Sequence, residues 1–273
     1  MKTFIVPTDF SETARNAAIY AVQIAAAVKD ANIILYNVFD KNTDQTSGTD
    51  ENSVSTKEMV EMAMESIKTE MVRYNDSVQI DCIAEKGNSL LDSLTKFALD
   101  QNADLIVMGI SETNRMEQML MGSNTLDMVN RNVCPVIIVP PHSRFKGIKK
   151  LLLASDFKDV EKTMPAKSIQ MLLDLFKSDV HVVNVDSEHF VELTEEYKGE
   201  KAKMELILEG YNTEYSFIRQ YDFVEAIGQF AADKNIDLIL TVPRKHSLLS
   251  KMFVTSNTKK LAYQSELPIV AVH

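Results

Sequence analysis

Glycine, hydroxyl and amide side chains are spaced in this chain as they would be around a bound phosphate. Gly109 directly follows an apolar run, and Gly122 and Ser123 come after twelve intervening residues, at the start of a segment with helical periodicity. A phosphate site requires backbone N–H groups that can approach a charged oxygen closely, together with the positive end of a helix. Gly109 permits a sharp turn, and Ser123, Asn124 and Thr125 can donate hydrogen bonds at the helix start. Capping of that helix alone would also explain Ser123 and Thr125.

Further candidate residues end or follow other apolar runs, which are typical of buried strands. Thr8 and Asp9 come after the first run, Val38 ends the second, and Met108 and Gly109 end the fourth. In a doubly wound sheet, ligands bind outside the carboxyl ends of the strands, where the strand order reverses. These residues are therefore expected to converge on one site. For Asp9 an alternative is a structural role at a helix N-terminus, where the helix dipole favours an acid.

The segment that contains these glycines occurs twice in the chain. Every equivalent pair of residues is 133 positions apart, with no insertion or deletion between the copies. Gly109 corresponds to Val242, and Gly122 corresponds to Thr255. A length of 273 residues is about twice that of one compact domain, so the repeat indicates two domains.

Short apolar runs alternate with longer helical patterns in each half, which is typical of a parallel sheet covered by helices on both faces. Right-handed crossovers then give each half a doubly wound, five-stranded parallel sheet. The second half repeats the order of the first from Lys150 onward. For the first half we expect strands at 3–8, 32–39, 77–84, 104–109 and 134–139, and helices at 11–29, 57–74, 89–101 and from about residue 122.

The expected domain boundaries are residues 1–141 for the first domain, 142–148 for a linker and 149–273 for the second domain. Pro140 and Pro141 end the last strand of the first domain. The polar stretch 40–55 has no counterpart in the second half and predicts a loop. The last strand of each half carries no charge that would protect an exposed edge, so we expect these two strands to pair and form an intrachain pseudo-dimer.

The chain is acidic, with a formal net charge of −10 and a pI near 5.1. Sequence-independent binding to nucleic acid or to an anionic membrane needs an excess of Lys and Arg, so we expect neither partner. No apolar run approaches the roughly 18 residues of a membrane span, and no export segment is visible, so a cytoplasmic location is expected. Cys82 and Cys134 are interpreted as structural thiols, and the histidine spacing predicts no metal site.

The segment from Gly109 to Ser123 resembles the loop of the universal stress protein family, in its tandem two-domain form. The family pattern is G-x-x-G, nine residues, then G-[S/T], and this chain has Gly109-Ile-Ser-Glu112, nine residues, then Gly122-Ser123. The resemblance extends to Ile5-Val-Pro-Thr-Asp-Phe-Ser11, Glu85-Lys-Gly87 and Cys134-Pro-Val-Ile-Ile-Val139. It implies an adenine nucleotide alpha hydrolase-like fold and a role in stress response.

In the nucleotide-binding branch of that family, adenine and ribose lie against the first two strand ends and the phosphates lie in the loop. The resemblance thus implies ATP or a related adenine nucleotide, with Mg²⁺, in the first domain only. The residues it implies are Pro7, Thr8 and Asp9 near base and ribose, Val38 beside the base, Met108 and Gly109 at ribose and phosphate, and Gly122, Ser123, Asn124 and Thr125 around the phosphates. Glu112 replaces one glycine and would repel a phosphate, which Arg115 would partly offset.

The second domain departs further from the family pattern. Val242, Lys245 and Thr255 replace the three glycines, and branched Val242 resists the positive φ that a glycine permits. We therefore expect this domain not to hold ATP in the family manner, although its basic loop 243–247 leaves a smaller anion as an alternative.

The residues favour binding over catalysis, because no nucleophile, base and orienting group can be assembled from them. The main hypothesis is a stress-response protein whose first domain binds an adenine nucleotide and whose second domain is structural. The alternative is an interaction module that has lost nucleotide binding in both halves. Slow ATP hydrolysis or autophosphorylation of Ser123 is the least favoured hypothesis. The sequence specifies no protein partner and leaves further dimerisation open.

Overall fold

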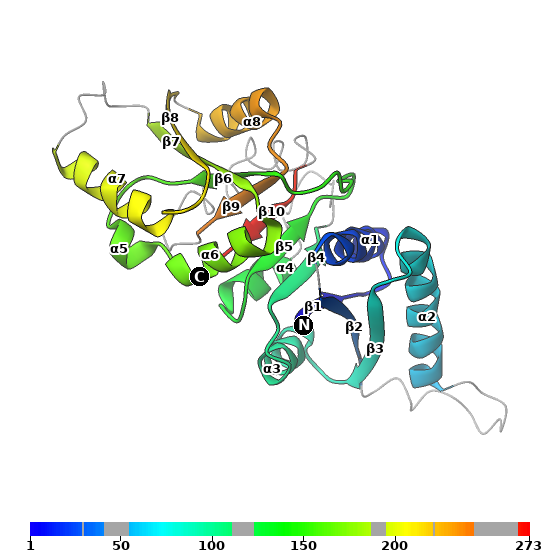
Figure 1. The fold of residues 1–273 in the computed structure, drawn as a ribbon. Coiled ribbons are helices and arrows are strands. Elements are labelled where there is room, and N and C mark those ends of the chain that lie inside the picture. Colours follow the sequence, from blue (N-terminus) through cyan, green and yellow to red (C-terminus); the bar gives the residue numbers. More distant parts are fainter. Residues whose placement is uncertain (29, 41–54, 111–122, 187–194, 221, 243–266) are drawn as a thin grey trace. The chain divides into compact units, whose positions relative to one another are not determined.

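The chain forms two compact units in its computed structural model, Met1–Phe145 and Lys146–His273. The structure describes residues 1–28, 30–40, 55–110, 123–186, 195–220, 222–242 and 267–273. Each unit contains a parallel β-sheet with helices packed against it (Figure 1). The predicted fold class, two tandem α/β domains with parallel sheets, is confirmed.

Unit 1 alternates strands and helices along the chain. Its elements are β1 (Lys2–Pro7), α1 (Glu12–Ala27), β2 (Ala31–Phe39), α2 (Thr56–Tyr74), β3 (Gln79–Lys86), α3 (Leu90–Asp100), β4 (Leu105–Gly109), α4 (Ser123–Asn130) and β5 (Val136–Val139). The strand order in the sheet is β3-β2-β1-β4-β5, and all neighbouring strands are parallel. The order therefore reverses between β1 and β4, which is where the ligand rule places a site.

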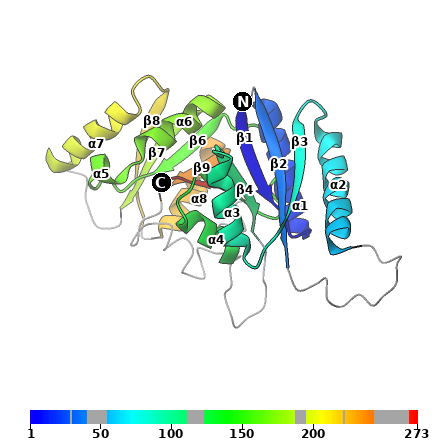
Figure 2. The ribbon, with the colours of Figure 1, turned by 90° about the horizontal axis from the view of Figure 1, so that it is seen from below.

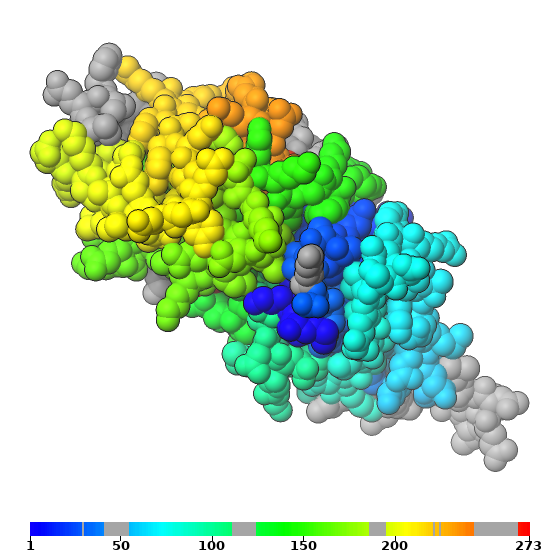
Figure 3. All heavy atoms as spheres, in the orientation of Figure 1, coloured from blue at the N-terminus to red at the C-terminus, as the bar shows by residue number. Residues whose placement is uncertain are grey.

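Helices cover both faces of this sheet. α1 and α2 pack together on one face, and α3 and α4 pack together on the other (Figures 1 and 2). α2 lies at the surface, in cyan in Figure 3, and its Met59 and Met62 side chains are 54% and 69% exposed. Its buried face consists of Met64, Ile67 and Met71, at helical spacing.

Local sequence explains where the helices begin. Ser11 caps α1 by accepting a hydrogen bond from the Ala14 amide, and Ser55 forms a capping box with Glu58 at the start of α2. β3 begins two residues later than predicted. The side chain of Asn75 accepts hydrogen bonds from the amide and hydroxyl of Ser77, and this Asx turn precedes the strand.

The core of unit 1 lies on both sides of its central strands. β1, β2 and β4 consist largely of fully buried aliphatic residues. Ala17, Ala18 and Ala21 of α1 are 0% exposed, so this helix approaches the sheet closely. Its proximity to the sheet determines the geometry at the end of β4.

Unit 2 repeats the order of unit 1 over its described residues, except that its first helix is divided in two. Its described elements are β6 (Lys150–Ala154), α5 (Val160–Thr163), α6 (Ala166–Phe176), β7 (Asp179–Asp186), α7 (Glu195–Ile207), β8 (Thr213–Arg219), α8 (Phe223–Lys234), β9 (Leu238–Thr241) and β10 (Ile269–Ala271). The strand order is β8-β7-β6-β9-β10. The counterpart of α1 is divided into α5 and α6 because Pro165, which has no amide hydrogen, stands between them. No described helix is long and apolar enough to cross a membrane.

Candidate functional site

The turn after β1 forms one side of the reversal point between β1 and β4. Thr8 is buried, and its hydroxyl accepts a hydrogen bond from the Phe10 amide at 3.0 Å. Phe10 has a φ of 67°, a left-handed conformation that is unusual for an aromatic residue. Asp9 is exposed, and its Oδ1 accepts hydrogen bonds from the amide and hydroxyl of Ser11, at 3.0 and 2.5 Å. The turn thus holds the Asp9 carboxylate at the surface, on the edge of the sheet where the strands have their carboxyl ends (the carboxyl edge).

A buried amide on the neighbouring strand stabilises this turn. Asn37, one residue before Val38 in β2, donates from Nδ2 to the carbonyl oxygen of Thr8 at 2.7 Å. The Thr8 amide in turn donates to the carbonyl of Tyr36 at 2.9 Å. The ends of β1 and β2 are therefore held together on either side of the position expected for a base. Sequence reasoning did not single out Asn37, although an amide inside the apolar run 31–39 was a visible signal.

Gly109 ends β4 where α1 leaves no room for a side chain. A Cβ at this position would lie 2.3 Å from the carbonyl oxygen of Thr13 and 2.6 Å from its carbonyl carbon. Real Cβ atoms do not approach backbone so closely, so close helix packing alone requires the glycine here. The contact brings the first turn of α1, at the positive end of the helix dipole, against the end of β4.

The first turn of α4 is tied to the same strand end. The hydroxyl of Thr125 is buried and donates to the carbonyl oxygen of Gly109 at 2.9 Å, so its proton is already used within the protein. Asn124 is exposed at the start of α4, and Ser123 is the first residue of that helix. Gly122 lies outside the described residues, as do Glu112 and Arg115.

The structure thus brings most of the predicted site residues to one edge of unit 1. Pro7, Thr8 and Asp9 end β1 or follow it, Val38 lies near the end of β2, and Met108 and Gly109 end β4. Met108 and Pro7 are buried, so side-chain contact with a ligand there is restricted to the more exposed members. Whether these residues bind a nucleotide remains a prediction.

A second, partly buried network, absent from the sequence predictions, lies beside the ends of β2 and β3. The hydroxyl of Tyr36 donates to Oε2 of Glu85 at 2.5 Å, and its ring stacks on Phe97 with centroids 4.6 Å apart. Burial raises the pKa of Tyr36 well above its ordinary value, and the Glu85 carboxylate raises it further. Register explains the contact, because β2 and β3 pair residue by residue from Asn32–Gln79 to Phe39–Lys86.

Unit 2 repeats the turn but not its surroundings. Asn184 donates to the carbonyl of Ser155 at 3.0 Å, and the Phe157 amide donates to the Ser155 hydroxyl at 3.1 Å. Phe157 also has a positive φ, of 49°. Its ring, however, is 2% exposed, with ring centroids 5.2 Å from Tyr197 and 5.9 Å from Phe217. Aromatic side chains of unit 2 therefore surround the residue that corresponds to the half-buried Phe10.

The start of the first helix in unit 2 is also occupied internally. Oε2 of Glu200, on α7, accepts a hydrogen bond from the Val160 amide at 2.6 Å, and its other oxygen accepts one from Lys203 at 2.6 Å. A carboxylate of the chain thus takes the helix N-terminus, where an external anion would otherwise bind. After β9, Val242 has a side chain in place of Gly109. The loop 243–247 and Thr255 lie outside the described residues.

Both halves of the chain match a known protein family. Residues 1–140 and 147–273 each match the model of the universal stress protein family. The chain belongs to this family. The universal stress protein MJ0577 of Methanocaldococcus jannaschii is 26% identical over 156 residues, covering 50% of this chain and 94% of that protein.

Solved universal stress proteins share the fold. One from Archaeoglobus fulgidus superposes with a TM-score of 0.67 at 17% identity, covering 99% of this chain and 95% of that one. Another is described as a complex with cAMP and is 23% identical, with a TM-score of 0.39, covering 50% of this chain and 96% of that one. The tandem family assignment made from the loop pattern is confirmed.

Proposed function

We propose that unit 1 binds an adenine nucleotide, with ATP as the leading candidate, and that unit 2 is its structural partner. The observation that carries the proposal is the convergence at the β1–β4 reversal point. The exposed Asp9 carboxylate, the end of β2 at Val38 and the first turns of α1 and α4 all meet at this carboxyl edge. Phosphates favour helix N-termini, and a carboxylate is a suitable acceptor for ribose hydroxyls.

The roles of the residues follow from their positions. Asp9 would accept a hydrogen bond from a ribose hydroxyl, because its side chain is exposed and its hydrogen bonds with Ser11 fix its orientation. Thr125 would act indirectly, since its hydroxyl holds α4 against Gly109. Phosphate contacts would then come from backbone amides and from the side chains of Ser123 and Asn124.

Restriction to unit 1 is part of the proposal. Glu200 already caps the first helix of unit 2, and the ring of Phe157 is buried among aromatic neighbours. A nucleotide there would have to displace a hydrogen-bonded carboxylate and compete with its charge. Unit 2 then serves as the structural partner of unit 1, and the cytoplasmic location expected from the sequence stays a prediction.

The experiment is isothermal calorimetry of ATP with Mg²⁺ on matched variants. Asp9→Ala removes the proposed ribose acceptor, and Asp156→Ala makes the corresponding change in unit 2, where Asp156 accepts from the Lys158 amide at 3.2 Å. We expect Asp9→Ala to weaken binding about tenfold or more and Asp156→Ala to leave it unchanged. Equal binding by both variants and the parent protein would refute the role of Asp9.

A second function is favoured by one residue, Glu112, which stands where the family loop has glycine. If this carboxylate excludes phosphate, the protein is an interaction module without nucleotide. The Glu112→Gly variant separates the two functions. Tight ATP binding that appears only in the variant supports the interaction module, whereas ATP binding by the parent protein supports the nucleotide site.

A further inference from the structure

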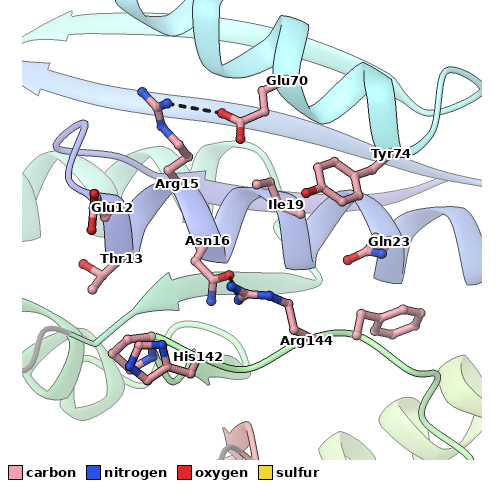
Figure 4. Close-up of a pocket in the computed structure, with 12 residues that line it drawn as sticks. Glu12, Thr13, Arg15, Asn16, Ile19, Gln23, Glu70, Tyr74, His142 and Arg144 are labelled. Atoms are coloured by element: carbon pink, nitrogen blue, oxygen red, sulfur yellow. Dashed lines mark hydrogen bonds and ion pairs between the residues drawn. The ribbon is translucent and has the colours of Figure 1, made fainter.

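A cavity of about 450 Å³ lies on the face of α1 away from the sheet. Its floor is a stripe of α1 that includes Arg15, Asn16 and Ile19, as Figure 4 shows. The end of α2 forms one wall, with Glu70 and Tyr74, and the segment 141–145 forms the other. The volume lies within the range of about 300–1,000 Å³ that is common for small-molecule sites.

Hydrogen bonds, an aromatic contact and an ion pair hold both walls of the cavity against α1. Asn16 donates from Nδ2 to the carbonyl oxygens of Pro140 and Ser143, at 3.0 and 3.3 Å. Phe145 packs edge-on against Tyr20 of α1, with ring centroids 5.4 Å apart. The opposite wall is joined to α1 by the ion pair between Arg15 and Glu70 at 3.4 Å. Contacts within the protein therefore hold both walls against α1, which lowers the entropic cost of binding.

Two carboxylates and two arginines line the cavity, but only one of the arginines is in an ion pair with a described residue. Arg15 and Glu70 neutralise each other, and Glu12 lies in the first turn of α1, where the helix dipole favours an acid. Arg144 donates from Nη1 to Oδ1 of Asn16 at 2.6 Å and to the carbonyl of Ser143 at 3.0 Å, and both acceptors are neutral. None of the ion pairs among the described residues involves Arg144. The residue is exposed, and its Nη2 and Nε are not used in these two bonds, so they are free to donate to a ligand.

Apolar surface adjoins this cation. Ile19 and Phe145 are half-buried, and Tyr74 is 52% exposed. A ligand that satisfies the site needs a flat apolar body and a single anionic group. A planar carboxylate suits the guanidinium fork, whereas Glu12 would repel a doubly charged phosphate more strongly.

We propose that this cavity is a binding site for small aromatic carboxylates, with the carboxylate on Arg144 and the ring between Ile19, Tyr74 and Phe145. The site is separate from the proposed nucleotide site, because it lies on the outer face of α1. The two nevertheless share the first turn of that helix. The Thr13 hydroxyl lies 3.1 Å from that of Ser11, which donates to Asp9, and Thr13 also lines the cavity.

The test titrates the full-length protein with 2-naphthoate and follows ¹H–¹⁵N NMR shifts. A ligand of this size is expected to bind with a Kd of about 1 mM or below. The shifts should be saturable and centred on the amides of Asn16, Ile19 and Arg144. The neutral isostere 2-naphthalenemethanol should bind about tenfold more weakly, because it cannot form the charged hydrogen bonds. This comparison needs no variant, so it does not depend on any substitution folding.

A matched pair of arginine variants tests the assignment of the carboxylate. Arg144→Gln should weaken 2-naphthoate binding about tenfold. Arg131→Gln should not change it, because Arg131 pairs with Asp92 elsewhere in unit 1, at 2.8 Å. Absence of saturable shifts at ten times the expected Kd, shifts centred elsewhere, or equal affinity of the Arg144→Gln variant and the parent protein would overturn the proposal. Thermal unfolding of each variant verifies that it is folded.

Discussion

Replacing Gly109 with alanine would place a methyl group 2.3 Å from the carbonyl oxygen of Thr13 and 2.6 Å from its carbonyl carbon. Both atoms belong to backbone in the first turn of α1, so rotation of a side chain cannot relieve the clash. Either β4 or the start of α1 must move, in a region where Ala17 and Ala18 are fully buried. Overpacking of this kind costs about 3 kcal/mol.

The measurement is urea and thermal unfolding of the full chain. A loss of about 3 kcal/mol in a unit of this size corresponds to a fall of about 10 °C in its Tm. The two units can unfold in separate transitions, so each needs its own probe. The effect should fall on unit 1, and nucleotide binding should weaken with it, because Gly109 positions the first turn of α1.

Gly199→Ala is the matched control. Gly199 lies within α7, and a Cβ there would meet nothing within 4 Å. Because alanine is the better helix former, this substitution should stabilise unit 2 by about 0.5–1 kcal/mol. The reasoning is wrong if Gly109→Ala changes the unfolding free energy of unit 1 by less than about 0.5 kcal/mol.

Three further substitutions have expected outcomes that unfolding experiments can check. Asn37→Leu should lower the unfolding free energy of unit 1 by about 2 kcal/mol in urea, because the buried carbonyl of Thr8 loses its 2.7 Å partner; an unchanged midpoint would contradict this. Burial and Glu85 raise the pKa of Tyr36, so the unfolded chain releases this proton first and unit 1 should lose stability above pH 10. Tyr36→Phe should reduce this loss but not remove it, because burial also raises the pKa of Cys82 and Cys134; an unaltered alkaline slope would argue against the network. Burial lowers the pKa of His181, so the unfolded chain takes up a proton first and unit 2 should lose stability as the pH falls below about 6.5. His181→Leu should make the unfolding free energy of unit 2 less dependent on pH in this range. An equal pH dependence in both proteins would rule out this role of His181.

The strands were predictable because buried strands consist mainly of apolar residues, which form recognisable runs in the sequence. The run 104–109 is almost entirely aliphatic and forms β4 at Leu105–Gly109, covered on both faces. Strand boundaries that depend on local polar turns were harder to predict. The start of β3 was placed too early, because Asn75 organises a turn through Ser77 and delays the strand.

The divided helix in unit 2 was missed because the second half was treated as a copy of the first. Pro165 was visible in the sequence, and proline interrupts a helix by removing a donor and crowding the preceding turn. The position of α5 also depends on Glu200, whose carboxylate meets the Val160 amide only after α7 has packed. Such a contact follows from the tertiary fold and has no local sequence signal.

The candidate site divides in the same way. Asp9 and Gly109 were predictable, since parallel strands bring their carboxyl ends to one edge. The bond from Asn37 to Thr8 and the pair of Tyr36 with Glu85 depend on the register of β1, β2 and β3. Register is fixed by the whole sheet, so these partners could not be derived from spacing alone.

Calorimetric stoichiometry of ATP with Mg²⁺ shows whether unit 1 binds one adenine nucleotide and unit 2 binds none. We expect one site per chain, lost in Gly122→Val and kept in Asp156→Ala. A stoichiometry of zero in the parent protein would contradict nucleotide binding. A stoichiometry of two would show that unit 2 also binds the nucleotide, although Phe157 is buried there and Glu200 accepts the hydrogen bond at the helix start.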